Sequence, residues 1–136
     1  MFTKTEKYNR ELLKAMNWLG EQPDTIFLGQ AVRYAGTGMF NSLLDIPDEK
    51  KLEFPVAENF QMGYSTGLAL NGYVPVSIFP RWNFLLCAAD QIVNHLDKLQ
   101  SMSSGKSNPR VIIRVAVGTE NPVDPQEQHK GNFSEA

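Results

Sequence analysis

A carboxylate and two glycines give the stretch from Pro55 to Val76 the clearest capacity for chemistry in the chain. Glu58 follows a short segment that contains a proline, and it opens a predicted helix that carries Gly63 and Gly67. A carboxyl group that is fixed in place and partly shielded from water can transfer a proton to or from a bound ligand. The alternative is that Glu58 serves the structure alone, because a negative charge stabilises the N-terminus of a helix.

Aromatic residues follow closely after the next predicted strand. Phe79 ends this strand, and Trp82 and Phe84 come just after it, with a proline and an arginine between. Together with Glu58 they form a constellation with the residue types of a site. The structural alternative is that these rings belong to the hydrophobic core, and their spacing leaves both interpretations open.

Other residues of reactive type are dispersed along the chain. Cys87 has apolar neighbours, which predict a small core residue rather than a nucleophile. His95 is expected on a helix surface, and His129 lies too far from it in sequence to define a site by spacing. The sequence carries no phosphate-binding loop, no dinucleotide-binding glycine motif and no histidine or cysteine cluster with metal-ligand spacing.

The elements that must position these residues follow from apolar periodicity and turn residues. The first segment predicts an amphipathic helix that stops at Gly20. We expect further helices at residues 58–71 and 83–99, the second being the longest, and strands at 25–29, 52–54, 74–79 and 110–117. Strands that alternate with helices are typical of an α/β fold with a mainly parallel sheet flanked by helices.

Two features predict contact with another chain. Gly63 and Gly67, four residues apart, leave a helix face without side-chain bulk, which another backbone can approach closely. Residues 84–89 are apolar all round, so we expect this end of the helix to be buried on more than one side. The sequence therefore predicts a substantial interface and an oligomer.

Length, charge and cysteine content exclude several classes of protein. The chain has 136 residues, enough for one domain, which we place at 1–136. Its 13 basic and 15 acidic residues give no positive field for binding nucleic acid. A single cysteine, no signal peptide and no long apolar run predict a soluble cytoplasmic protein without a membrane partner.

Several motifs, in their order and spacing, resemble the transketolase-like thiamine diphosphate enzymes. The resemblance is to their pyrimidine-binding domain, which is a three-layer α/β domain, and above all to the beta subunits of 2-oxo acid dehydrogenases. It spans roughly residues 5–135, and the segments that carry it are Leu28-Gly29-Gln30, Ala57-Glu58, Gly72 to Val76, Ile78 to Phe84, Ala89 to Asn94 and Gln128-His129.

The resemblance implies a role for each predicted site residue. Glu58 would bind the aminopyrimidine ring of thiamine diphosphate and activate it by proton transfer. Trp82 would stack against the ring, with Met62 and Phe84 also at the cofactor. His129 would stand near the substrate as a proton donor. The substrate would be a 2-oxo acid or a ketose.

Departures from the family pattern imply a partner. The chain has no Gly-Asp-Gly segment followed by Asn, which holds Mg2+ and the diphosphate in the family, and it has no third domain. We therefore expect an alpha-type, diphosphate-binding subunit that binds most of the cofactor and its Mg2+. No metal ligand is predicted in this chain itself.

Two further features leave alternatives open. Gln30 stands where the family has a glutamate that helps to link paired active sites by proton transfer, and an amide cannot do this. Residues 118–136 are loop-rich and end like the start of a helix, so we expect the domain to be truncated relative to the family. The alternatives are a scaffold or regulatory subunit without catalysis and, if the resemblance is chance, an unrelated nucleotide-binding protein.

Overall fold

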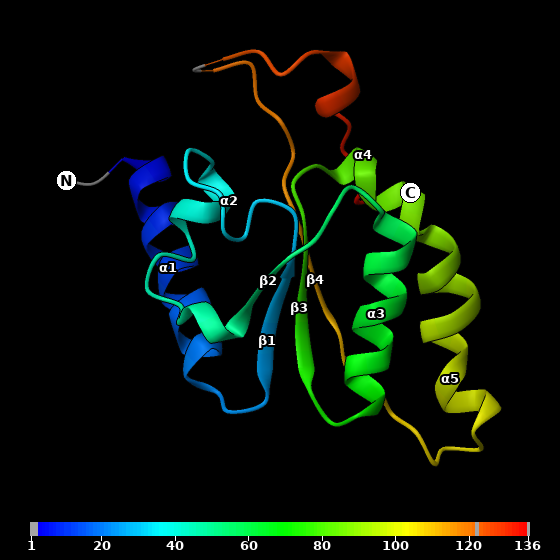
Figure 1. Ribbon diagram of the computed structural model, residues 1–136. Coiled ribbons are helices and arrows are strands. Elements are labelled where there is room, and N and C mark those ends of the chain that lie inside the picture. The colour runs from blue at the N-terminus through cyan, green and yellow to red at the C-terminus, as the bar shows by residue number, and fades with distance from the viewer. Residues whose placement is uncertain (1–2, 122, 136) are drawn as a thin grey trace.

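The computed structural model describes residues 3–121 and 123–135, which fold into three layers (Figure 1). Met1, Phe2, Pro122 and Ala136, which belong to the predicted domain range, lie outside the described residues. The middle layer is a four-stranded sheet of order β2-β1-β3-β4 in which all neighbours are parallel. Its strands are β1 (Thr25–Gly29), β2 (Lys51–Glu53), β3 (Val74–Phe79) and β4 (Ile112–Val115). The predicted α/β class with a parallel sheet flanked by helices is confirmed.

Helices cover both faces of this sheet. One face carries α1 (Lys4–Glu21) and the short α2 (Gly38–Asn41), and the other carries α3 (Glu58–Leu70), α4 (Trp82–Leu85) and α5 (Asp97–Met102) (Figure 1). Single-turn 3-10 helices lie at Asp48–Lys50, Leu86–Ala88 and Glu127–His129. No helix formed by the described residues is long and apolar enough to cross a membrane.

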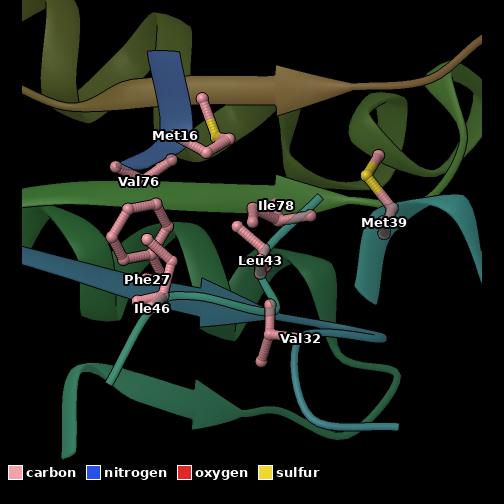
Figure 2. Packing of buried hydrophobic residues seen from close by; sticks show 8 residues of the cluster. All are labelled: Met16, Phe27, Val32, Met39, Leu43, Ile46, Val76 and Ile78. Atoms are coloured by element: carbon pink, nitrogen blue, oxygen red, sulfur yellow. The ribbon is translucent and has the colours of Figure 1, made fainter. Parts of the chain in front are cut away.

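Two hydrophobic clusters separate the layers. The cluster on the α1 side joins Met16 to Phe27, Val76 and Ile78 of the sheet and to the chain around α2 (Figure 2). The cluster on the α3 side consists of Met62, Phe79, Leu85 and Ala88. Successive residues of a strand point to opposite faces, and β3 accordingly contributes Val76 and Ile78 to the first cluster and Phe79 to the second.

The N-terminal helix begins and ends by identifiable contacts. Thr3 and Glu6 form a reciprocal cap at its start. The helix runs to Glu21, one residue past the predicted stop at Gly20. Gly20 is instead buried against Ile46, and a Cβ added there would lie only 2.4 Å from the Cδ1 of that side chain. The glycine thus allows close packing between two segments rather than ending the helix.

The prediction of one regular helix at 83–99 is wrong, because this segment is helical but not a continuous α-helix. Residues 82–102 are helical throughout, but a 3-10 turn follows α4 and a π-helix at Gln91–Leu96 precedes α5. The longest helix is therefore α1, with 18 residues. No proline or glycine lies in 82–102, so no helix-breaking residue accounts for the change in hydrogen-bond pattern. We attribute it to the packing of this segment in the second hydrophobic cluster.

The start of that segment is also less buried than predicted. Leu85 and Ala88 pack into the core, but Leu86 and Cys87 are exposed. The reason is that α3 and the sheet cover one side of this helical segment, so residues that point away from both face solvent. The prediction that Cys87 is a core residue is wrong.

After β4 the chain crosses the carboxyl edge of the sheet as a long loop. The Trp82 N–H donates to the Ala116 carbonyl at 2.9 Å, and the Gly118 N–H donates to the His129 carbonyl at 3.1 Å. Lys130 forms ion pairs with three carboxylates of the same loop, Glu120, Asp124 and Glu127. The tail thus packs at the end of the molecule where α3 and α4 begin (Figure 1).

Candidate functional site

The residues predicted to act together follow neighbouring strands of one parallel sheet. Gln30 comes directly after β1, Glu58 begins the helix after β2, and Trp82 begins the helix after β3. All four strands point the same way, so these residues lie at its carboxyl edge. The chain leaves β1 for β2 on one side and later returns as β3 on the other. Such a switch in strand order is where α/β sheets bind ligands.

Glu58 is a nearly buried carboxylate at this edge. Only 9% of the residue is exposed, and it is the first residue of α3, where its charge favours the helix N-terminus. The Gln30 Nε2 donates a hydrogen bond to its Oε1 at 3.1 Å. No other donor among the described residues is bonded to this carboxylate. The Oε2 oxygen is therefore available to a donor or a proton of a bound ligand.

A second carboxylate holds the loop that presents Gln30. Both oxygens of Glu53 accept hydrogen bonds from the backbone N–H groups of Ala31, Val32 and Arg33, at 2.7, 2.8 and 2.8 Å. Ala31 has a φ of 60°, a left-handed conformation that these bonds help to fix. Sequence reasoning missed Glu53, although a carboxylate at the carboxyl end of a strand is a signal for such a contact.

Buried polar contacts join α3 to β3 next to Glu58, and we call this group, made by Gln61, Ser77 and Ile78, the floor of the site. The side chain of Gln61, one turn further along α3, donates from Nε2 to the Ser77 Oγ and the Ile78 carbonyl, both at 3.0 Å. Met62 is fully buried in the second hydrophobic cluster. The structure thus places Met62 in the core behind Glu58.

The predicted aromatic residues have separate neighbours. Trp82 is half-buried against the second cluster, and the ring of Phe133 meets it edge-on with centroids 5.9 Å apart. Phe84 instead meets the ring of His129 edge-on at 5.4 Å. The Nδ1 of His129 lies 2.6 Å from the Pro125 carbonyl, which restrains the imidazole ring.

A cavity of about 570 Å³ opens beside this edge of the sheet. Phe84 and His129 line it, whereas Glu58, Trp82 and Met62 do not. The structure therefore brings together Glu58 with Gln30, and separately Phe84 with His129 at the cavity.

The cavity also has two basic residues in its lining, Arg81 and Arg114. Sequence reasoning did not single out either of them as part of a site. For Arg114 the available signal is a charged residue within a strand, on the same face as the apolar Ile112 and Ala116.

The described residues at this edge include no cluster of metal-ligating side chains. Within 3–121 and 123–135, no group of three or more His, Cys, Asp or Glu residues is arranged to hold a metal ion. His95 lies on the exposed surface, as predicted, with its Nε2 at 3.3 Å from Asp90.

The fold and this edge define a class of protein. A parallel three-layer domain with a nearly buried glutamate at a helix start is consistent with a transketolase-like pyrimidine-binding domain. Sequence comparison then identifies relatives. The chain is 32% identical to the mitochondrial pyruvate dehydrogenase E1 component subunit beta of Saccharomyces cerevisiae, over 97% of this chain and 37% of that protein.

Two further relatives are of the same kind. The 3-methyl-2-oxobutanoate dehydrogenase subunit beta of Mycobacterium tuberculosis is 30% identical over 83% of this chain and 32% of that protein. The pyruvate dehydrogenase E1 component subunit beta of Cyanidium caldarium is 32% identical over 71% of this chain and 30% of that protein. No protein-family model matches the chain. The chain is thus a homologue of 2-oxo acid dehydrogenase E1 beta subunits, and it spans about a third of their length.

Proposed function

We propose that this chain is the pyrimidine-binding half of a thiamine diphosphate-dependent enzyme. The observation that carries the proposal is Glu58, a nearly buried carboxylate at the carboxyl edge of the sheet with one oxygen free of described hydrogen-bond donors. The homology to E1 beta subunits supports the same class of enzyme. The reaction would be decarboxylation and dehydrogenation of a 2-oxo acid, or transfer of a ketol group.

Glu58 would act on the pyrimidine ring. Thiamine diphosphate supplies a thiazolium carbon that becomes a nucleophile when it loses its proton. The Glu58 carboxyl group would exchange a proton with a ring nitrogen of the aminopyrimidine, which promotes that loss through the amino group. Its burial suits this role, because a shielded hydrogen bond is stronger than one in water. The Gln30 amide would hold the carboxyl group in position.

The remaining predicted residues take supporting roles in the proposal. Trp82 would offer an aromatic surface to the pyrimidine, and its contact with Phe133 restrains the indole. Met62 would support the floor from the core. Phe84 and His129 line the neighbouring cavity, so His129 would stand at the substrate end as a proton donor.

The diphosphate end of the cofactor would come from another chain. The acidic diphosphate needs Mg2+ and oxygen ligands, and the described residues include no cluster of three or more His, Cys, Asp or Glu side chains that could hold a metal ion. We propose an alpha-type, diphosphate-binding subunit as partner, in a homo- or hetero-oligomer of the cytoplasm, with no activity by the chain alone. Exposed aromatic side chains on α3, Phe60 and Tyr64, give that helix a surface suited to a partner.

Reconstitution tests the proposed function. The chain is mixed with its diphosphate-binding partner, thiamine diphosphate and Mg2+, and decarboxylation of 2-oxo acids and ketol transfer are assayed. We expect activity only in the mixture, and Glu58→Gln lowers it about 100-fold or more. Glu49→Gln, at an exposed residue on a different part of the surface, is the matched control. Full activity in Glu58→Gln would sink the mechanism.

A non-catalytic scaffold or regulatory subunit is the second candidate. Gln30 favours it, because an amide cannot pass a proton between paired sites as a carboxyl group does. Calorimetry separates the two: thiamine diphosphate binding by the complex supports an enzyme. A complex that binds no cofactor supports the scaffold.

A further inference from the structure

The cavity beside the candidate site has the dimensions of a small-molecule site. Its walls come from α1, from the segment around Thr37 and from the ends of β3 and β4, with His129 at its border. Its volume of about 570 Å³ lies within the range of about 300–1,000 Å³ typical of ligand pockets. Its lining combines apolar groups such as Leu12 and Met39 with a few polar ones.

The charged residues that line this cavity are all basic. Arg81 and Arg114 both contribute to it, and none of the described residues around the cavity is acidic. The Arg81 Nη1 donates to the Pro80 carbonyl at 2.7 Å. Within the described part of the chain, neither arginine forms an ion pair with a carboxylate. Two guanidinium groups thus border one cavity without a counter-ion.

Arg114 is the more unusual of the two. It lies in β4 on the face that packs toward α1, between Ile112 and Ala116. Its Nη1 is buried and has no hydrogen-bond partner among the described residues. Burial lowers the pKa of the guanidinium, yet arginine stays protonated in proteins. A buried N–H group without a hydrogen-bond partner is costly, and an anion bound in the cavity would supply that partner.

We propose that this cavity binds the carboxylate or phosphate group of a small molecule through Arg81 and Arg114. Guanidinium groups bind both anions with paired, charge-assisted hydrogen bonds. The Thr37 hydroxyl accepts from the Phe40 N–H, so its own proton is free to be donated to the same anion. The binding of an anion here is independent of the proposed function. Only the further step, that this anion is the charged end of the substrate, rests on the proposed function.

Titration calorimetry at constant ionic strength tests the site, with inorganic phosphate, glycerol 3-phosphate and pyruvate as probes. We expect at least one probe to bind the wild-type chain, and Arg114→Met to weaken it roughly tenfold or more. Arg110→Met removes the same charge from an exposed position just before β4 and is expected to change the affinity less than twofold. Tighter binding of pyruvate identifies a 2-oxo acid, and tighter binding of glycerol 3-phosphate identifies a phosphate ester.

Two further measurements keep the result unambiguous. Arg81→Met, a change at the end of β3, is expected to weaken the same probe if Arg114→Met does not fold. In NMR spectra of the wild type, we expect the bound probe to shift the amide resonances of Thr37, Gly38 and Ala116. Glu58→Gln binds the probe as the wild type does, so that failure of the proposed function and failure of this site are separable. Absence of binding by every probe, or equal weakening by Arg110→Met and Arg114→Met, would overturn the proposal.

Discussion

At the residue scale, the pair of Glu58 and Gln30 determines what the site can do. Glu58 keeps 9% of its surface accessible and receives one amide hydrogen bond, which fixes the carboxyl group without neutralising it. Gln30 has no acidic proton to pass on. In the proposed enzyme, Glu58 would therefore exchange protons with the cofactor alone, and a proton relay through residue 30 would be absent.

A second charged residue gives a prediction on pH. Lys51 is buried, and its Nζ lies 2.9 Å from the exposed Asp48 carboxylate. The hydrogen bond from Lys51 lowers the pKa of the Asp48 carboxyl below its ordinary value. A lowered folded-state pKa stabilises the protein above the unfolded value of about 3.9, and this contribution is lost as the pH falls through the folded-state pKa.

We expect Asp48→Asn to lower the free energy of unfolding at pH 7 and to have no effect at pH 2. Urea unfolding at a series of pH values measures this difference. Asp24→Asn, at an exposed residue whose side chain has no ion pair among the described residues, is the control and should show no such trend. An effect of Asp48→Asn that is as large at pH 2 as at pH 7 would argue against the ion pair.

At the element scale, the loop after β1 depends on a neighbouring strand. Glu53 lies opposite Gly29 in the pairing of β1 with β2, and from there its carboxylate holds three successive backbone N–H groups. We expect Glu53→Gln to lower the free energy of unfolding by about 1–3 kcal/mol, because an amide offers one acceptor oxygen and no charge. Chemical denaturation measures this loss, and hydrogen exchange at residues 31–33 should become faster.

The control for this variant is Glu49→Gln, which removes an exposed carboxylate from the 3-10 turn before β2. It should leave both stability and exchange unchanged. Unaltered exchange at 31–33 in Glu53→Gln would mean that the loop is held by other contacts.

The end of β1 is an element that requires glycine. Gly29 has a φ of 138°, and a Cβ there would lie 2.1 Å from the Ile78 carbonyl oxygen of the neighbouring strand. Gly72, at the end of α3, also has a positive φ, of 91°, but a Cβ there would meet nothing within 4 Å. We expect Gly72→Ala to cost about 1 kcal/mol and Gly29→Ala about 3 kcal/mol or more. Thermal and urea unfolding compare them, and equal losses would contradict the close approach.

At the scale of the whole molecule, much of the fold follows from local sequence. The strands at 25–29 and 74–79 and the helix start at Glu58 match the structure, because apolar and β-branched runs end at glycine or proline there. The helical segment after β3 was less predictable. Its 3-10 and π turns depend on tertiary packing in the second hydrophobic cluster, which the periodicity of apolar residues along the sequence does not predict.

The candidate site was predictable only in part, for a similar reason. Glu58 and Gln30 could be singled out because each lies beside a strand end, in segments that carry the family resemblance. The contact of Glu53 with the loop after β1 depends on strand register. The burial of Arg114 depends on tertiary packing around β4, so neither could be derived from neighbouring residues in sequence.

The chain spans about a third of the length of its relatives. In the proposed function, this domain would offer the Glu58 carboxylate to the pyrimidine, while the diphosphate would need a second chain. The chain would then supply half of the site, and the proton exchange at Glu58 is the step on which the proposed function depends.

The most direct test is the rate at which the thiazolium C2 proton of thiamine diphosphate exchanges with deuterium, followed by NMR. It is measured in the complex of the chain with its diphosphate-binding partner and Mg2+, for the wild type, Glu58→Gln and the Glu49→Gln control. We predict rapid exchange in the wild type and the control, and exchange about 100-fold slower or more in Glu58→Gln. Exchange at the wild-type rate in Glu58→Gln, with the cofactor still bound, would contradict a proton-exchange role for Glu58.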